Sequence, residues 1–519
     1  MAPARYRRFG DHGLPLTSPP GLRRFLRTPL TASSNRRRGQ ALPLAGVDLH
    51  IEPVPRGVGA GRAVEDALRE AVRSGRLAAG TRLPGSRTLA ADLGLARGTV
   101  VGAYTQLVAE GWLTGSPGSG TRVAHVSAPE PCDAGHHAKS APTERRWRAD
   151  LRPGRPDFTS FPHRAWTTSV RRVLSRIGAG DLDYGDFEGT ATLRASVAAH
   201  AARTRGARVT PDAVVITAGF THGLAVLART LHGLGVRHAA TEDPGLARHR
   251  ELLTAAGLAC EPLRVDEFGA DPADLTPQTG AALLTPAHQH PSGVVLSPAR
   301  RGEFVAWAAR CDGFLIEDDY DGEFRYDGRP VGALQALDPE RIVLAGSVSK
   351  SLAPGLRLGW LVVPPTLRAP VTAAMRENGG GVSVIEQLTL ADLVARGDYD
   401  RHVRRVRTVY RRRRAELADR VGAITGLRLV GAAAGLHALL PLPSAEHERR
   451  LIAAGAYAGL RLHGLHSSDY HHPPDPSAPA ALVLGYATPA PHAWGQALDL
   501  LGEVLEAEEW RTGARDTRP

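Results

Sequence analysis

The chain has 519 residues, of which 42% are hydrophobic and 23% are charged, a length and composition typical of a globular protein with two or three domains. No apolar run approaches the roughly 18–20 residues of a membrane span, the N-terminus lacks the apolar segment of a secretory signal, and three scattered cysteines are too few for a disulfide framework. We therefore expect a cytoplasmic protein without a membrane partner. The formal net charge of +11 is consistent with a polyanionic partner.

The first quarter of the chain contains a tail and a small domain. Residues 1–44 mix Arg, Pro, Gly and Ser without apolar periodicity, which predicts a disordered basic tail. Beyond residue 45, Val64, Leu68 and Val72 recur at helical spacing, a short helix is predicted after Ser86 as N-cap, and another over residues 96–110. GWLTGSPGSGTRVAHV predicts two short strands joined by a Ser-Pro-Gly-Ser-Gly turn. Three helices followed by a hairpin predict a winged helix-turn-helix over residues 45–125.

This small domain carries a family resemblance. The stretch SGRLAAGTRLPGSRTLAADLGLARGTVVGAYTQLVAEGWL and the wing sequence PGSGTRV resemble the GntR family of bacterial transcription regulators. The resemblance implies that Arg87, Arg97 and Thr99 contact DNA and that the wing around Gly120 follows the minor groove. Arg97 and Thr99 would also lie at the exposed start of the third helix, where such folds read base edges.

The predicted DNA-binding domain departs from the GntR family at two positions of its third helix. Gly98 and Gly102 stand where the GntR family carries polar helix formers, and each costs up to about 1 kcal/mol of helix stability relative to alanine. A small helical interaction domain is the alternative interpretation of residues 45–125.

Residues 126–149 are rich in Pro, Ala, Ser and charged residues, which predicts a linker.

Residues 150–510 alternate strand and helix patterns, ahead of a short tail at 511–519. Apolar runs predict strands in VVITAG, HAATEDPG, AALLTPAHQHPSG, FLIEDDYDGEF and RIVLAGSVSK. Helical patterns such as ARRGEFVAWAARC separate them, so we expect a mostly parallel sheet with helices on both faces. A long basic helix, HVRRVRTVYRRRR, then precedes a small α+β unit with a final strand, ALVLGYA. We interpret the arginines at 404–414 of this long helix as a solvated face, with direct contact to DNA as the alternative.

Lys350 is the first candidate for chemistry. It is one of two lysines among 64 basic residues, and the other, Lys139, lies in the predicted linker. A lysine amine can deprotonate and attack a carbonyl carbon, which a guanidinium cannot do. Lys350 follows an apolar strand, and ligands collect at strand ends in open α/β sheets. For a lysine considered alone, an ordinary surface position is the alternative.

Other strand ends supply partners for this lysine. Asp318 can meet a protonated ring nitrogen, and Tyr320, two residues further, can donate to a ring oxygen. Groups suited to a phosphate lie beside the lysine and at a strand-to-helix junction: Ser347, Ser349, Arg357, Gly219, Phe220 and Thr221. A lysine for an aldehyde, an acid for a pyridinium and a phosphate cup together describe pyridoxal 5′-phosphate (PLP).

The order of the motifs PGRPDFTSFP, LDYGDFEGTATLR, TAGFTHGL, EDPGLARHR, TPAHQHPSG, EDDYDGEFRY and GSVSKSLAPGLRLGW resembles fold-type I aminotransferases. With its GntR-like head, the chain resembles the MocR-type (GabR-like) transcription regulators. The resemblance implies that Lys350 is the Schiff-base lysine, that Asp318 binds the pyridine nitrogen and that Tyr320 contacts the ring hydroxyl. It also implies that Ser347, Ser349 and Arg357 hold the phosphate. Tyr184 would reach the phosphate site of the partner subunit in a homodimer.

Two departures from the aminotransferase pattern bear on activity. Leu246 stands where relatives carry a tyrosine that stacks on the cofactor, and Val483 aligns with the arginine that binds the substrate carboxylate. Efficient transamination is therefore not expected. Arg248 or Arg250 could bind the carboxylate in place of the missing arginine. His288 and Gln289 occupy the stretch in which aminotransferases carry an asparagine near the ring.

The sequence thus favours a PLP-binding, ligand-responsive transcription regulator. It would bind a double-stranded DNA operator as a homodimer and respond to a small effector, either an amino compound or PLP itself. An active aminotransferase with a vestigial head and a DNA-binding protein whose second half only dimerises are the alternatives. No metal is expected, because the candidate ligands lie in a Pro-rich loop without paired helical spacing: His463, His466, Asp469, His471 and His472.

Overall fold

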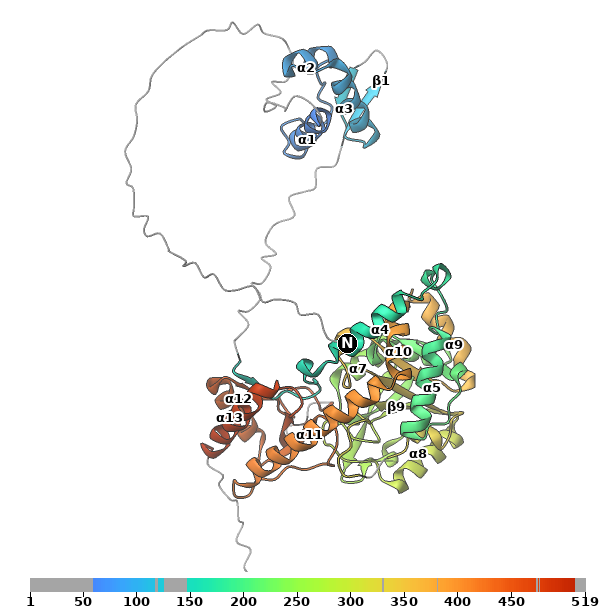
Figure 1. Cartoon of the computed structure of the whole chain (residues 1–519), viewed down its shortest axis with the longest axis vertical. Helices are drawn as coiled ribbons and strands as arrows, with labels where there is room; N and C mark the ends of the chain where they lie inside the picture. Colours follow the sequence, from blue (N-terminus) through green and yellow to red (C-terminus); the bar gives the residue numbers. More distant parts are fainter. Residues whose placement is uncertain are drawn as a thin grey trace, which may run out of the picture. The chain divides into compact units, whose positions relative to one another are not determined.

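The computed structural model describes residues 59–116, 120–125, 147–328, 331–379, 381–472, 475 and 477–508. The predicted basic tail, the centre of the wing turn, nearly all of the linker and the C-terminal tail lie outside these described residues. The chain divides into two compact units, residues 1–143 and 144–519. In Figure 1 the helices of the first unit are blue and those of the second run from green to red. Within the described ranges, no helix is long and apolar enough to cross a membrane.

The first unit is a three-helix domain with a hairpin, as predicted. Its elements are α1 (Ala60–Arg73), α2 (Ser86–Leu93), α3 (Arg97–Ala109), β1 (Leu113–Ser116) and β2 (Gly120–Val123). One apolar core joins all five of them, because Val64, Leu68, Val100 and Leu107 all pack in the same cluster, with Leu113 and Val123 of the hairpin. This arrangement is the predicted winged helix-turn-helix.

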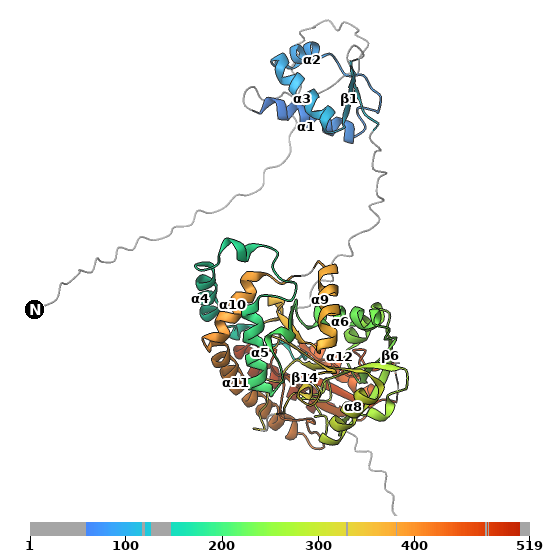
Figure 2. The same ribbon diagram turned by 90° about the vertical axis from the view of Figure 1, so that its right-hand side faces the viewer.

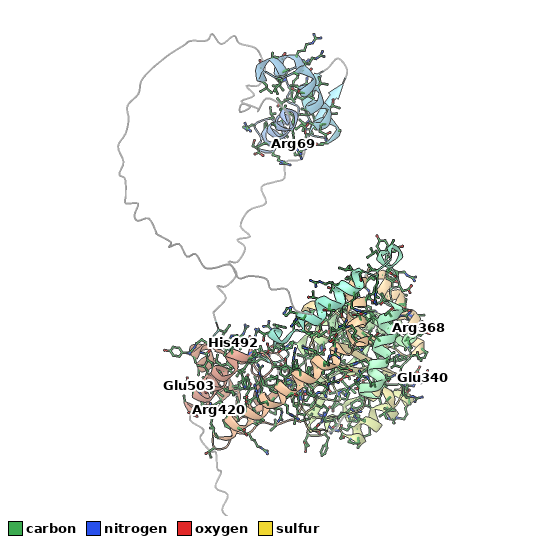
Figure 3. All side chains as sticks on the ribbon, in the orientation of Figure 1. Arg69, Glu340, Arg368, Arg420, His492 and Glu503 are labelled. Atoms are coloured by element: carbon green, nitrogen blue, oxygen red, sulfur yellow. The ribbon has the colours of Figure 1, made fainter. Side chains whose placement is uncertain are left out.

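Two contacts hold the helices of this domain at fixed angles. Arg69 of α1 donates to both carboxylate oxygens of Glu110, at 2.8 and 2.7 Å, and so ties α1 to the end of α3 (Figure 3). The hydroxyl of Tyr104 donates to the carbonyl of Pro84, 2.9 Å away, which links α3 to the turn before α2. The N-cap of α2 is Gly85 and not Ser86, which is the first residue of the helix.

The second unit is built around an eight-stranded sheet with the order β4-β11-β10-β9-β8-β5-β6-β7. The central pairs β10–β9, β9–β8, β8–β5 and β5–β6 are parallel, which confirms the predicted mostly parallel sheet. Only β11 and β7 run antiparallel to their neighbours. The strands are β4 (Val214–Thr217), β5 (His238–Asp243), β6 (Ala259–Asp266), β7 (Gly269–Ala270), β8 (Thr279–Leu284), β9 (Phe314–Asp319), β10 (Ile342–Ser347) and β11 (Gly359–Val362).

Helices cover both faces of this sheet because successive strand residues point to opposite sides. Val214 and Ile216 of β4 pack in a cluster with residues of α5 (Ala191–Arg205) and α10 (Val384–Ala395). Val215 packs instead with α6 (Phe220–Gly233) and α9 (Pro365–Glu377), on the other face (Figure 2). The remaining helices around the sheet are α4 (His163–Leu174), α7 (Ala247–Ala255) and α8 (Pro298–Cys311).

A long helix leads to a smaller α+β part, also as predicted. The elements are α11 (Asp398–Gly422), β12 (His437–Leu442), α12 (Ala445–Ala458), β13 (Leu460–Arg461), β14 (Ala480–Gly485) and α13 (Trp494–Glu506). β12 pairs with β14, and β13 pairs with β3 (Ala149–Asp150) at the start of the unit. The interpretation of α11 as a solvated basic face is wrong for Arg413, whose side chain is 1% exposed.

Candidate functional site

A cavity of about 470 Å³ opens where β9 and β10 end and α6 begins. Ligands of open α/β sheets bind at such strand ends. Eight residues predicted to bind the cofactor line it: Phe220, Thr221, Asp318, Tyr320, Ser347, Ser349, Lys350 and Arg357. Tyr184 does not line it and is 99% exposed, in the segment before α5.

Lys350 is half-buried and lines this cavity. Its Nζ donates to the carbonyl of Gly154, 2.7 Å away. Burial lowers the pKa of Lys350, and the charges of Asp318 and Asp321 oppose that shift. Gly154 has φ 76°, and a Cβ on it would lie 3.8 Å from Nζ. A lowered pKa increases the fraction of the neutral amine, which is the nucleophilic form of lysine.

Asp318 is a buried carboxyl at the end of β9. Burial raises the pKa of Asp318 well above its ordinary value, Lys350 opposes the shift, and Asp319 and Asp321 add to it. His249 Nε2 lies 3.9 Å from Asp318 Oδ2. Burial, with the charges of Lys350 and Arg250, lowers the pKa of that imidazole to about 4. A cationic ring nitrogen placed beside Asp318 would therefore stabilise its ionised form.

Tyr320 is held by the histidine-rich stretch that follows β8. Its hydroxyl donates to the carbonyl of His288 at 2.9 Å, and His288 Nδ1 lies 2.8 Å from Asp321 Oδ2. Burial raises the pKa of Tyr320 well above its ordinary value, so the phenol stays a hydrogen-bond donor. His288 therefore lies behind Tyr320, and Gln289 Nε2 is bound to the carbonyl of Pro244 at 2.8 Å.

The residue of this stretch that lines the cavity is His290, which the sequence reasoning did not select. Its Nε2 lies 3.2 Å from the hydroxyl of Tyr470, which also lines the cavity. Burial lowers the pKa of His290 well below its ordinary value, and the nearby charge of His437 adds to the shift. The imidazole is thus neutral and can serve as a donor or an acceptor toward a ligand.

The opposite end of the cavity is suited to a phosphate. Gly219 is the N-cap of α6 with φ 79°, and its missing Cβ would lie 3.5 Å from Arg357 Nη1. The guanidinium of Arg357 therefore lies against the free N–H groups and positive end of a helix. Ser347 and Ser349 add hydroxyls to the same cavity. An amine, a carboxyl, a phenol and an anion cup in one cavity are a donor set that fits PLP.

The positions that depart from the aminotransferase pattern form an apolar wall. Val483 is fully buried and packs in one cluster with Leu246 and Tyr470. Arg250 is also buried and donates to the carbonyls of Gly245 and Tyr470 at 3.0 and 3.2 Å, so it has no free fork for a ligand. Arg248 lines the cavity, with a side chain 62% exposed and a contact of 3.0 Å to Glu251. Of the two arginines, only Arg248 faces the cavity.

The N-terminal segment of the second unit closes one side of the cavity, and sequence reasoning missed its residues. Arg152, Gly154 and Arg155 line the cavity, as does His463 from the smaller α+β part. Arg152 is held by Asp150, with Nη2 2.7 Å from Oδ2. The motif PGRPDFTSFP contained Gly154 and Arg155, but nothing in it indicated which strand ends it would meet. None of the described residues form a group of three or more His, Cys, Asp or Glu that could hold a metal ion.

The first unit presents a separate candidate interface. Arg87 on α2 and Arg97, the first residue of α3, are exposed, and Thr99 is half-buried. Gly120 begins β2 with φ 82°, and a Cβ there would lie 3.1 Å from the Nε of the exposed Arg82. Arg82 was not selected from the sequence, although it belongs to the RLPGSR stretch. Its position beside the wing adds an exposed guanidinium to those of Arg87 and Arg97.

Comparisons with protein families cover both units. The description "Aminotransferase class I and II" matches residues 155–460, and "Bacterial regulatory proteins, gntR family" matches residues 60–123. The aminotransferase class I and II fold implies dependence on PLP. An archaeal alanine:glyoxylate aminotransferase has the same fold as the second unit, with a TM-score of 0.63, 22% identity and coverage of 69% of this chain and 90% of that one.

Curated relatives contain both units in one chain. The uncharacterized HTH-type transcriptional regulator YhdI of Bacillus subtilis (strain 168) is 34% identical over 81% of this chain and 90% of its own. The HTH-type pyridoxine biosynthesis transcriptional regulator PdxR of Corynebacterium glutamicum is 35% identical, over 72% of this chain and 82% of its own. The probable rhizopine catabolism regulatory protein MocR of Rhizobium meliloti is 31% identical, over 86% and 94%. The chain therefore belongs to the MocR-type family of HTH transcription regulators, which join a GntR-type DNA-binding domain to an aminotransferase-like domain.

Proposed function

We propose that this regulator binds PLP at Lys350 and a DNA operator through its first unit, and that a small effector in the same cavity as the cofactor controls DNA binding. The observation that carries the proposal is the cavity in which Lys350, whose pKa is lowered by burial, lies with Asp318 and Arg357. In this proposal residues 45–125 bind DNA, residues 126–149 link, and residues 150–510 bind the cofactor and the effector.

Each residue of the cavity has a role that follows from its chemistry. When bound, PLP supplies an aldehyde and an electron-withdrawing pyridine ring. Lys350 Nζ would be the amine that binds the aldehyde. Asp318 would accept from a protonated ring nitrogen, and Tyr320 would donate to the ring oxygen once its O–H turned away from the His288 carbonyl. The phosphate would be held by the remaining donors: Ser347, Ser349, Thr221, the N-terminal N–H of Phe220 and Arg357.

The effector is either an amino compound or PLP itself. The name of the Corynebacterium relative, a regulator of pyridoxine biosynthesis, supports PLP as the signal. The name of the Rhizobium relative, a regulator of rhizopine catabolism, supports a small metabolite. Arg155 and Arg248, which line the cavity with side chains 45% and 62% exposed, supply cations for an acidic group on such an effector.

The cofactor assignment is tested by borohydride reduction of the PLP-treated protein and peptide mapping. The adduct is expected on the peptide with Lys350, and Lys350→Ala should abolish it. Lys139→Arg is the matched control, because it removes the only other lysine of the chain and should leave the adduct in place. An adduct on Lys139, or none at all, would contradict the proposal.

The DNA assignment is tested with an operator selected from random fragments by the full-length protein. Arg97→Ala should weaken binding by about 1–3 kcal/mol and relax the preference at one base pair, as expected for a base-reading arginine. Arg76→Ala, an exposed arginine in the turn after α1, is the control. If Arg97→Ala bound the selected operator as tightly as the wild type, the assignment of α3 as the recognition helix would be wrong.

Efficient transamination is not expected from this cavity. Turnover needs the substrate carboxylate fixed, and a bidentate arginine is the usual means. Val483 is apolar and Arg250 is bound to main-chain carbonyls, so neither provides that fork. The measurement is oxo-acid production from a panel of amino acids with the PLP-loaded protein. Steady turnover at about 1 s⁻¹ or faster, the low end of ordinary enzymes, would instead favour an active aminotransferase.

A further inference from the structure

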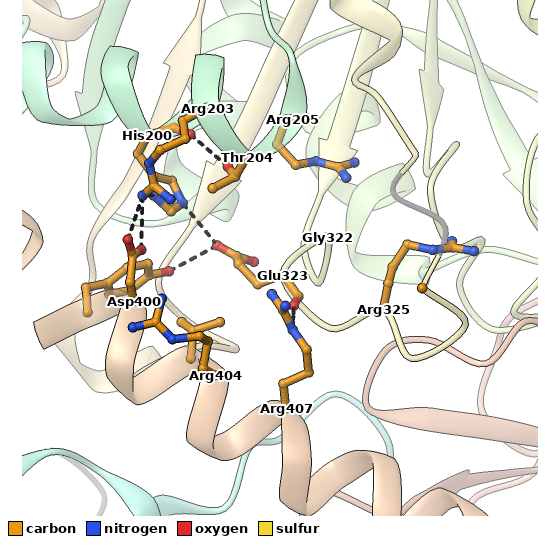
Figure 4. A pocket seen from close by; sticks show the side chains of 13 residues that line it. His200, Arg203, Thr204, Arg205, Gly322, Glu323, Arg325, Asp400, Arg404 and Arg407 are labelled. Carbon is orange, nitrogen blue, oxygen red and sulfur yellow. Dashed lines mark hydrogen bonds and ion pairs between the residues drawn. The ribbon is translucent and has the colours of Figure 1, made fainter. Parts of the chain in front are cut away.

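A second cavity, of about 360 Å³, lies between the end of α5, the segment after β9 and the first half of α11. It shares no lining residue with the cavity that contains Lys350. Its lining is strongly basic, as Figure 4 shows: Arg203, Arg205, Arg325, Arg404 and Arg407 surround it, with Glu323 and Asp400 as the lining acids. Nothing in the proposed function uses this cavity.

Three of the five arginines are paired with acids. Arg203 Nη2 lies 2.8 Å from Asp400 Oδ2, and Arg205 Nε lies 2.7 Å from Asp319 Oδ2. Arg325 is paired with Asp327. These pairs hold the side chains around the cavity and neutralise part of its charge.

The other two arginines are not neutralised by a carboxylate. Arg407 Nε donates to the main-chain carbonyl of Glu323 at 2.6 Å, which leaves its charge uncompensated. Arg404 is exposed, and its guanidinium makes no hydrogen bond or ion pair with any residue that the structure describes. The Glu323 carboxylate is bound elsewhere, since Oε1 lies 3.0 Å from the Tyr399 hydroxyl and 3.8 Å from His200 Nε2.

A buried donor adds a second, independent observation. Arg205 is 7% exposed, and its Nη2 has no hydrogen-bond partner among the described residues. Gly322 lies directly against this guanidinium, because a Cβ on it would be 2.9 Å from Arg205 Cζ. An unsatisfied charged N–H inside a protein costs free energy that an acceptor on a ligand would recover. Arg205 and Gly322 both line the cavity, so this guanidinium lies in the cavity wall.

We propose that this second cavity is a binding site for a small anion that carries a phosphate group, held by Arg205, Arg404 and Arg407. Planar guanidinium forks approaching from α5 and from α11 suit the several oxygens of a phosphate monoester better than a single carboxylate. The volume is within the range of about 300–1,000 Å³ of small-molecule sites. A DNA backbone could contact the exposed Arg404, but it is too bulky to reach the buried Arg205. The proposal is therefore a free phosphate ester.

The test is a calorimetric titration, with glycerol 3-phosphate, of the full-length protein that has been loaded with PLP and then freed of unbound PLP. Glycerol is the uncharged control ligand. Binding should be saturable with the ester and absent with glycerol. Arg404→Glu and Arg407→Gln should each weaken binding about tenfold or more, the usual effect of losing a hydrogen bond between charged groups.

Arg411→Glu is the matched control, because Arg411 is exposed two turns further along α11 and does not line the cavity. It should leave the affinity for the ester unchanged. Absence of saturable binding up to millimolar concentrations, or equal weakening by Arg404→Glu and Arg411→Glu, would overturn the proposal. A second arm uses a DNA duplex of unselected sequence. If duplex binding depends on both arginines while the ester does not bind, the basic face of α11 contacts DNA and the small-anion site is refuted.

Discussion

The two glycines of the recognition helix allow a quantitative prediction. Neither Gly98 nor Gly102 has positive φ, and a Cβ added at either position meets no heavy atom within 4 Å. Alanine therefore fits at both sites without strain. Alanine is favoured over glycine by up to about 1 kcal/mol in a helix interior, so the double variant Gly98→Ala/Gly102→Ala should stabilise α3 by roughly 1–2 kcal/mol.

Hydrogen exchange of the full-length protein, followed by mass spectrometry, measures the local stability of α3. Exchange from α3 peptides should slow by roughly five- to thirtyfold, since 1.4 kcal/mol corresponds to a factor of ten. Gly94→Ala is the control, because Gly94 ends α2 in the left-handed region with φ 64°, where alanine costs about 1–2 kcal/mol. Unchanged or faster exchange in the double variant would refute the reasoning, because it would mean that helix propensity does not limit the stability of α3.

Three further predictions concern the second unit. Arg413→Ala should destabilise the protein by about 3–5 kcal/mol in denaturant unfolding, because it removes one partner of a buried ion pair with Asp157; a loss under 1 kcal/mol would argue against that pairing. Burial raises the pKa of Glu242 to about 7, so its contribution to stability is lost as the pH rises from about 4.3 to 7, by roughly 3 kcal/mol. Glu242→Gln should therefore flatten the pH dependence of the unfolding temperature over that window, and an unchanged slope would contradict the assignment. Light scattering should give a homodimer, with Tyr184 reaching the partner's site; a monomer that retains PLP would be inconsistent with that role.

The sequence predicted the parts of the fold that local patterns determine. Buried strands are continuous apolar runs. The five runs predicted for the main sheet became β4, β5, β8, β9 and β10 of the central sheet, and the final run ALVLGYA became β14 of the smaller sheet. The site residues at strand ends could be predicted for the same reason, because a polar residue directly after an apolar run lies at the edge of the sheet. The antiparallel β11 was not predicted, since strand–helix alternation indicates parallel neighbours only.

Residues that reach the cavity from distant segments could not be found in this way. His463 comes from the smaller α+β part and Arg152 from the start of the second unit, and only tertiary packing brings them to Lys350. Arg413 is a different case. Val406, Tyr410, Arg413 and Leu417 recur at helical spacing and are all buried, so the helical period of α11 carried a signal that the charge of the arginine run concealed.

The two arginines after Leu246 show how local geometry decides between equal candidates. Arg248 and Arg250 both lie in α7 and differ by two positions, which is about 200° around a helix of 3.6 residues per turn. One guanidinium must therefore face the cavity while the other points to the far side. The sequence could not say which, because that depends on how α7 rotates against β5 and the loop that contains Asp469 and Tyr470.

The same alternation places two cavities on opposite sides of one strand end. Asp318 faces Lys350, whereas Asp319, the next residue of β9, turns to Arg205 at 2.7 Å. The two sides are also joined through Tyr399, whose hydroxyl lies 3.0 Å from the Glu323 carboxylate and 2.8 Å from the hydroxyl of Ser351, the residue after Lys350. We therefore expect that a ligand which changed the pairing of Asp319 or Glu323 would act on the segments that carry Asp318 and Lys350. Because coupling between two sites is reciprocal, an occupant of the first cavity would change the affinity of the second by the same factor.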